Sequence, residues 1–228
     1  MGDPLPKKKD ISEKDLSTII SSAMVKKKEF EEMIKRKEKI ISDIVDLFTS
    51  EQIDHEKLSQ YADSLFMISE WEKGENRLTR SLESKLYILL IYKFLDDKEH
   101  LEKILETFNQ LLDQIKNETL SWKDYDRAFL FEVYGFLRDL IVYREEAKVI
   151  SPEYISLVYP NIRDLPKTIV LYLKKEINKE EFVKSFKDYE EFASKNNLME
   201  QLEIIKNFIP LIQAYWKMTG AVSDQTME

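Results

Sequence analysis

Glycine is the residue whose scarcity most limits the folds available to this chain, because it occurs at only 4 of 228 positions. Proline contributes only 6 more residues. A β-rich or loop-rich fold requires turn residues at short intervals, and Gly and Pro supply many of them. The four glycines, at positions 2, 74, 135 and 220, also lie too far apart for a Gly-rich phosphate-binding loop. The composition therefore predicts an all-α protein.

Apolar residues recur at helical spacing along almost the whole chain. Several starts are marked by capping residues, among them Asp54, Ser151 followed by Pro152, and Asn178. This pattern predicts eight or nine helices in an irregular helical bundle or a short helical-repeat array, with a long amphipathic helix at the N-terminus. The expected helices cover residues 12–48, 54–71, 77–95, 97–115, 121–148, 151–160, 164–173, 178–195 and 198–218.

The expected domain organisation follows from the same pattern. Residues 1–11 are predicted to be a disordered lead-in, 12–48 the long helix, 49–218 the bundle and 219–228 a flexible tail. Residues 76–97 resemble residues 118–139 when the chain is shifted by 42 positions, a period typical of two-helix repeats. Because no third copy is evident, we favour a bundle and keep a repeat array as the alternative.

Two segments are apolar on nearly all sides and are therefore expected to form the core. The first is the second half of the helix at 77–95, and the second is the stretch 128–143, which is polar only at Glu132, Arg138 and Asp139. The predicted core residues are Leu89, Leu90, Phe129, Val133, Phe136, Leu137 and Leu140.

The residues available for catalysis or metal binding are few. The chain has no Cys and only two His residues, which removes disulfides, thiolate nucleophiles and Cys-ligated metals. Asp97 and His100 have the i, i+3 spacing of metal ligands on one helical face, but a helix cap explains the same pair. The pairs Glu72/Glu75 and Glu99/Glu102 have the spacing of Mg²⁺-binding acids, which chance alone produces in so acidic a chain. We predict no catalytic residue, no metal site and no cofactor.

Charge is distributed unevenly along the chain. The net charge is −8, yet residues 1–40 contain 11 Lys and Arg against 8 Asp and Glu. Nucleic-acid binding proteins usually carry a stronger positive charge, and acidic residues are interleaved among these cations. Phosphate contacts are therefore the alternative interpretation, and a solvated helix face the favoured one. The candidate phosphate contacts are Lys26, Lys27, Lys28, Lys35, Arg36 and Lys37.

The helix at 12–48 carries an apolar stripe longer than one face of a small domain usually needs. Such a stripe docks in a partner's groove, pairs with its own copy, or folds back on the bundle. We predict partner contacts at Ile20, Phe30, Ile34 and Ile41.

The expected function follows from that stripe and from the few catalytic candidates. We expect a non-enzymatic scaffold or accessory subunit that binds another protein or itself, in the cytoplasm and without a membrane. The alternative is an accessory factor that contacts DNA or RNA through the basic segment. A carboxylate metal-dependent enzyme is a distant third.

Overall fold

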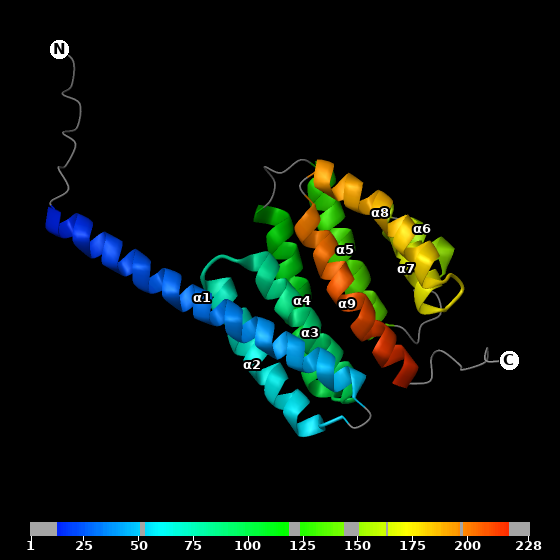
Figure 1. Ribbon diagram of the computed structural model, residues 1–228, viewed down its shortest axis with the longest axis horizontal. Coiled ribbons are helices and arrows are strands. Elements are labelled where there is room, and N and C mark those ends of the chain that lie inside the picture. Colours follow the sequence, from blue (N-terminus) through cyan, green and yellow to red (C-terminus); the bar gives the residue numbers. More distant parts are fainter. Residues whose placement is uncertain are drawn as a thin grey trace, which may run out of the picture. The chain divides into compact units, whose positions relative to one another are not determined.

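The computed structural model describes residues 13–50, 53–118, 124–143, 151–162, 164–196 and 198–218. Nine α-helices make up most of these residues, and the described ranges contain no β-strand (Figure 1). The all-α prediction is confirmed. The helices are α1 Glu13–Thr49, α2 His55–Gly74, α3 Leu78–Phe94, α4 Lys98–Glu118, α5 Asp124–Val142, α6 Pro152–Val158, α7 Asp164–Leu173, α8 Lys179–Lys195 and α9 Met199–Met218. The expected lead-in (1–11), the tail (219–228) and the first residues, 121–123, of the helix expected at 121–148 lie outside the described residues.

The chain divides into two compact units, residues 1–40 and residues 41–228. In the first unit every described residue belongs to α1. The second unit contains the end of α1 and all of α2 to α9.

Helix α3 is the centre of the second unit and packs against α2, α4, α5 and α9 (Figure 1). Its residues from Leu86 to Tyr92 are all buried, as expected of a helix covered on every side. Helices α7 and α8 pack on each other and on α9. The predicted core residues are fully buried, apart from Phe129, whose side chain lies outside the description.

The predicted helix starts are confirmed where they are described. The Asp54 carboxylate accepts a hydrogen bond from the Lys57 amide at 2.9 Å, and Ser151 Oγ accepts one from the Tyr154 amide at 3.1 Å. Asn178 forms a complete capping box with Glu181. Each cap satisfies amides that have no partner within the first turn of the helix.

The helix ends were predicted less well. Helix α5 ends at Val142 rather than near Lys148. Tyr143 lies in a bend, and residues 144–148 of the expected helix lie outside the described residues. Helix α2 continues to Gly74, three residues beyond its expected end at Trp71.

Three of the described helices are followed, within two residues of their ends, by a residue that is in the left-handed region and is not glycine. Asn76, Asp96 and Lys175 have φ of 57°, 54° and 59°. The amide that follows each of them bonds five residues back, as from Arg77 to the Glu72 carbonyl at 2.8 Å. This is the Schellman arrangement, which usually places glycine at the left-handed position.

The two segments related by 42 residues differ in structure. Asp97 follows the end of α3 and caps α4, whereas Asp139, its counterpart in the alignment, lies inside α5 and is buried. Aligned residues therefore have different structural roles, which favours the irregular bundle over the repeat array.

Candidate functional site

The predicted partner-binding residues lie on α1 but in two different units. Phe30, Ile34 and Ile41 share one face of the helix, because they are four and seven residues apart. Phe30 and Ile34 belong to the first unit and Ile41 to the second, and all three are partly exposed. The side chain of Ile20 lies outside the described residues.

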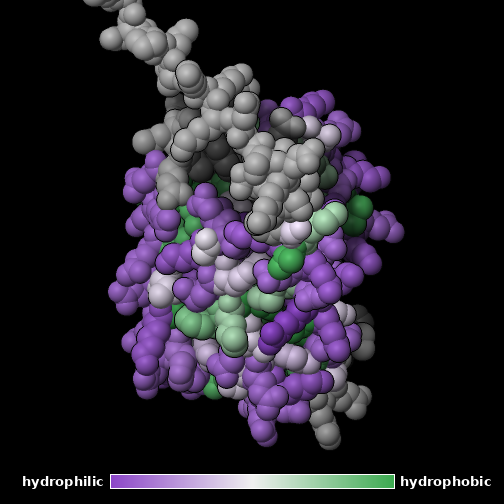
Figure 2. All heavy atoms as spheres, turned by 90° about the vertical axis from the view of Figure 1, so that its left-hand side faces the viewer, coloured by the Kyte–Doolittle hydropathy of each residue, from purple (hydrophilic) through white to green (hydrophobic). Residues whose placement is uncertain are grey.

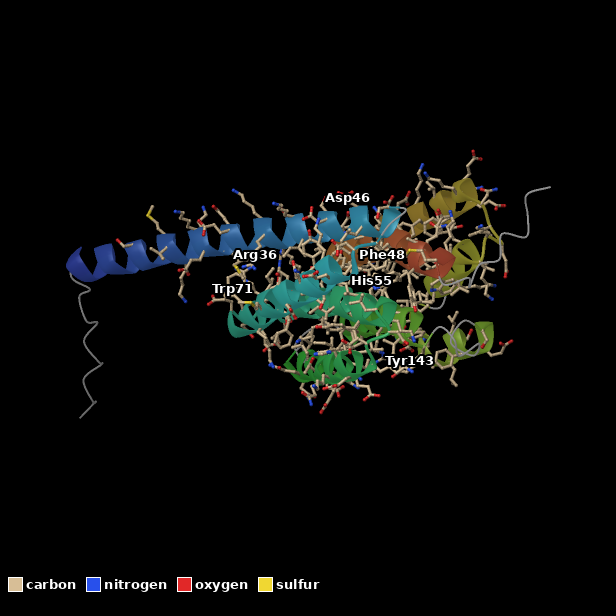
Figure 3. All side chains as sticks on the ribbon, turned by 90° about the horizontal axis from the view of Figure 1, so that it is seen from below. Arg36, Asp46, Phe48, His55, Trp71 and Tyr143 are labelled. Carbon is tan, nitrogen blue, oxygen red and sulfur yellow. The ribbon has the colours of Figure 1, made fainter. Side chains whose placement is uncertain are left out.

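Beyond Ile41 the stripe of α1 belongs to the core of the second unit. Ile44 and Phe48 are buried, and the Phe48 ring packs edge-on against Phe94 at 5.1 Å. His55 approaches the same Phe94 ring at 5.6 Å, and Figure 3 shows Phe48 and His55 close together. Within residues 13–40, Lys37 and Ile40 are buried as well, so the described part of the stripe that keeps exposed apolar surface ends at Ile34.

The predicted phosphate contacts are mostly exposed. Lys26, Lys27, Lys28, Lys35 and Arg36 have exposed side chains, whereas that of Lys37 is buried. Two of the exposed lysines are paired along the helix, Lys27 with Glu31 at 3.9 Å and Lys28 with Glu32 at 3.8 Å. Such long, solvated pairs contribute little to stability, and their charges remain available to another molecule.

The Asp97–His100 pair is a helix cap in the structure. Asp97 accepts a hydrogen bond from the His100 amide at 3.1 Å, and its other oxygen lies 2.8 Å from His100 Nδ1. The His100 ring stacks on Tyr92 at 5.1 Å. The bond from the His100 amide is the main reason that the pKa of Asp97 is lowered. No third acidic or histidine side chain joins the pair, since the described residues hold no cluster suited to a metal ion.

The two acid pairs do not form a site either. Glu72 is buried and accepts a hydrogen bond from Ser84 Oγ at 2.8 Å, whereas Glu75 caps the end of α2. Glu99 pairs with Lys103 at 2.6 Å, an exposed contact that lowers the pKa of Glu99.

A buried polar cluster around Asp139 of α5 was not predicted as a unit. Its carboxylate is 1% exposed and accepts hydrogen bonds from the hydroxyls of Tyr159, at 2.5 Å, and Tyr154, at 3.1 Å. Arg138 pairs with the same carboxylate at 2.6 Å and donates to Asn109 of α4 at 2.9 Å. The cluster thus joins α4, α5 and the segment around α6.

The electrostatics of this cluster favour a charged Arg138 beside a neutral Tyr159. Burial, and then the neighbouring Asp139, raise the pKa of Tyr159 far above its ordinary value. Burial alone would lower the pKa of Arg138, but the adjacent Asp139 carboxylate outweighs it and the pKa rises. Tyr159 therefore remains a hydrogen-bond donor, which suits a structural fastening better than proton transfer.

Glu132 lies two turns before Asp139 on α5 and holds the next part of the same segment. Its carboxylate accepts the backbone amides of Asn161 and Ile162, each at 2.9 Å, and the Asn161 side chain. The one available signal in the sequence was the polar character of Glu132 and Asp139 within an otherwise apolar helix.

A second buried charge lies between α2 and α3. Lys85 is 1% exposed, and its Nζ lies 3.0 Å from Glu70 and 5.4 Å from the centre of the Phe66 ring. The pairing of Ser69 Oγ with Ser81 Oγ at 2.9 Å joins the same two helices. These contacts specify how α2 and α3 pack, and the sequence did not indicate them.

One small cavity opens between α3, α5 and α9. Its volume is about 160 Å³, and its lining combines Arg80, Glu83 and Glu203 with Tyr134. The Tyr134 hydroxyl donates a hydrogen bond to the Thr79 carbonyl at 3.2 Å. The cavity has room for a few water molecules or one small polar molecule, and it contains no arrangement of nucleophile and base.

The surface carries scattered apolar side chains. Figure 2 shows a face on which hydrophilic residues predominate and hydrophobic ones form small patches. Met67 is 64% exposed and Leu157 81%. Single exposed residues of this kind are common in globular proteins. In the part of the chain that the structure describes, every helix is too short or too polar to cross a lipid bilayer.

Comparison with known proteins adds no assignment: no family model, curated protein or solved structure matches the sequence. The apolar stripe of α1 within residues 13–40 is therefore chosen as the candidate functional site from the character of its side chains alone.

Proposed function

We propose that this chain is a helical scaffold or accessory subunit that binds another protein along residues 13–40 of α1. One observation supports the proposal most. The apolar stripe continues through these residues, and Phe30, Met33 and Ile34 keep part of their surface exposed, whereas Lys37 and Ile40 at its end are buried.

A long helix in a protein is stabilised chiefly by the apolar face that it buries. Residues 13–40 extend for roughly 42 Å at 1.5 Å per residue. An isolated helix in water gains little from propensity and most from burying an apolar face. Phe30 and Ile34 lie on such a face and remain partly exposed. A protein groove or another helix covers a face of this shape, with anchors at i, i+4 and i+7.

Contact with DNA or RNA is the alternative function. It is favoured by the five exposed cations between Lys26 and Arg36. It is disfavoured by Glu29, Glu31 and Glu32, which lie among them and would repel phosphates. We therefore give the apolar face precedence over the charged one.

The test replaces two residues of the stripe in the full chain. The variant Phe30→Ser with Ile34→Ser should lose a protein that the unaltered chain captures from its host, while its melting temperature stays the same. The matched control, Lys28→Ser with Glu32→Ser, alters the opposite face and should capture that protein normally. A stripe variant that melts much earlier and still captures the same protein would overturn the proposal.

The dependence of binding on ionic strength distinguishes protein docking from nucleic-acid contact. Apolar docking should persist as the ionic strength rises, whereas phosphate contacts weaken steeply. Reversal of Lys26, Lys28, Lys35 and Arg36 to Glu should remove nucleic acid from the captured material if the alternative is correct. Loss of all capture in that variant, together with normal capture by the stripe variant, would establish the alternative.

A further inference from the structure

One face of α1, away from the apolar stripe, carries two exposed lysines and an exposed methionine. Lys28 follows Met24 by four residues and Lys35 follows Lys28 by seven, so the three side chains share this cationic face. Met24 is 69% exposed, and both lysines are exposed as well. At 3.6 residues per turn, Lys28 lies roughly 160° around the helix from Phe30. The cationic face is therefore separate from the stripe of the proposed function.

The exposed face of α2 carries residues of complementary chemistry at the same spacing. Asp63 follows Glu56 by seven residues and Met67 follows Asp63 by four, so these three side chains share an acidic face. Both acids are exposed, and Met67 is 64% exposed. The methionine comes first on α1 and last on α2. The two patterns therefore match when the helices run in opposite directions.

We propose that the cationic face of α1 in one copy of the chain binds the acidic face of α2 in a second copy, with the two helices antiparallel. Three pairs of residues then lie opposite each other across the contact: Lys28 and Asp63, Lys35 and Glu56, and Met24 and Met67. This inference goes beyond the proposed function, because it uses another face of α1 and commits to a second copy of the chain as the partner.

The methionines decide the direction and the register of the contact. Lys28 and Lys35 can also face two of the three acids spaced seven residues apart on α2 in one other antiparallel and two parallel alignments. In each of these alternatives Met67 lies opposite a charged residue, which is Glu31, Glu32 or Lys39. Burying a charge against an apolar side chain is costly. The proposed alignment alone combines both charge pairs with an apolar pair.

The charges on both faces are held only weakly by contacts within their own helix. Lys28 lies 3.8 Å from Glu32, and the two side chains are 80% and 65% exposed. The bond that Gln60 donates to Glu56 is long, at 3.4 Å. Solvated contacts of this kind contribute little, so these charges remain available to another copy. The excess of cations within residues 1–40 and of acids in the rest of the chain also favours attraction between copies.

The main test measures the mass of the full chain by sedimentation over a range of concentrations. The contact joins two different faces, so a second identical contact closes a two-fold dimer, or further copies add as an open chain. Either assembly supports the proposal and raises the mass above the 27.2 kDa of one chain as the concentration increases. A chain that stays monomeric up to its limit of solubility would overturn it.

Charge reversal tests the central pair of the contact. Lys28→Glu and Asp63→Lys each place like charges opposite each other and should weaken self-association by roughly tenfold or more. Lys27→Glu is the matched control, because it also breaks one i, i+4 contact, the one with Glu31 at 3.9 Å. Lys27 lies about 100° around the helix from Lys28. The control should therefore associate like the parent, and an equal loss in both variants would contradict the assignment of the face.

Mixing the two single variants shows whether the reversed residues meet between chains. A chain with Lys28→Glu and a chain with Asp63→Lys should associate with each other nearly as well as the parent, because an acid then faces a lysine in every contact between unlike chains. Mixing cannot repair an effect within one helix. A mixture that associates as weakly as its components would overturn the proposal.

Cysteine cross-linking tests the register, and the chain has no native cysteine to interfere. Chains with Met24→Cys and chains with Met67→Cys should form a disulfide when they are mixed. Chains with Ser59→Cys should not link to Met24→Cys, because Ser59 lies about 12 Å along α2 from Met67. Preferential linking to Ser59→Cys would indicate a parallel alignment and would overturn the proposal.

Discussion

The hydroxyl of Tyr159 donates a hydrogen bond of 2.5 Å to the Asp139 carboxylate, although the two residues are twenty positions apart. The Tyr159 ring also packs edge-on against Phe136 at 5.6 Å, and its edge comes within 3.5 Å of where a side chain on Gly135 would begin. One tyrosine thus fastens the segment after α6 to the central helix α5 by a polar contact and an apolar one.

Removing that hydroxyl should weaken the bundle. Tyr159→Phe keeps the ring but removes a donor to a buried carboxylate, so the free energy of unfolding should fall by about 1.5–3 kcal/mol. Urea denaturation of the full chain measures the change. Tyr154→Phe is the matched control and should cost less, because its bond is longer at 3.1 Å and its side chain is only partly buried. Equal stability of Tyr159→Phe and the parent would contradict the fastening role.

The core of α5 provides a second prediction. Phe136 is fully buried, so Phe136→Ala should lower the free energy of unfolding by about 3–5 kcal/mol through lost burial and the cavity left behind. Leu157→Ala, at a side chain that is 81% exposed, should change it little. Thermal and urea unfolding compare the two. If both variants melt like the parent, α5 is not the central helix of the core.

These contacts also show what the sequence can and cannot predict. Asp54 and Asn178 were recognised as caps, because a cap acts on amides two or three residues away. The core positions of α5 followed from an apolar stretch within a single helix. The partners of Glu132 and Asp139 lie 15 to 30 residues further along the chain, and no local pattern identifies them.

The candidate functional residues divide in the same way. The stripe of α1 is a local feature, so the sequence placed Phe30 and Ile34 correctly on one face. It did not show that Ile41 belongs to a different unit, because that depends on which residues the core covers. It treated Lys37 like the other cations, yet its side chain is buried. Burial is a property of the folded chain and not of a residue's own charge.

The end of α7 offers a stabilising substitution. Lys175 has φ of 59°, and a residue with a Cβ in the left-handed region costs roughly 1–2 kcal/mol. Glycine removes that strain but loses about 0.5–1 kcal/mol to the greater freedom of the unfolded chain. Lys175→Gly should therefore stabilise the protein by about 0.5–1 kcal/mol, seen as a higher melting temperature.

The control for Lys175→Gly is the same substitution at the neighbouring residue, Lys174. Lys174 is not among the described non-glycine residues with positive φ, so Lys174→Gly relieves no strain and should only destabilise. The two variants make the same replacement, lysine by glycine, at adjacent positions. If both shift the melting temperature in the same direction, strain at Lys175 is not what the substitution relieves.

The last prediction concerns the pH dependence of the cap on α4. Hydrogen bonds from the backbone amide and then the ring of His100 lower the pKa of Asp97 below its ordinary value of 3.8. Because the pKa is lower in the folded chain than in the unfolded one, ionised Asp97 stabilises the fold above that value. This stabilisation is lost as the pH falls through the folded pKa. Asp97→Asn keeps a capping oxygen but has no proton to gain.

Urea unfolding at a series of pH values from neutral to acid should therefore show a steeper loss of stability for the parent than for Asp97→Asn. His100→Ala should retain most of the difference, since the backbone amide is the larger cause and remains in place. A direct titration of the Asp97 carboxyl by NMR gives the same answer independently. Parallel pH profiles for the parent and Asp97→Asn, or an Asp97 pKa at or above its ordinary value, would show that the cap does not depend on the charge.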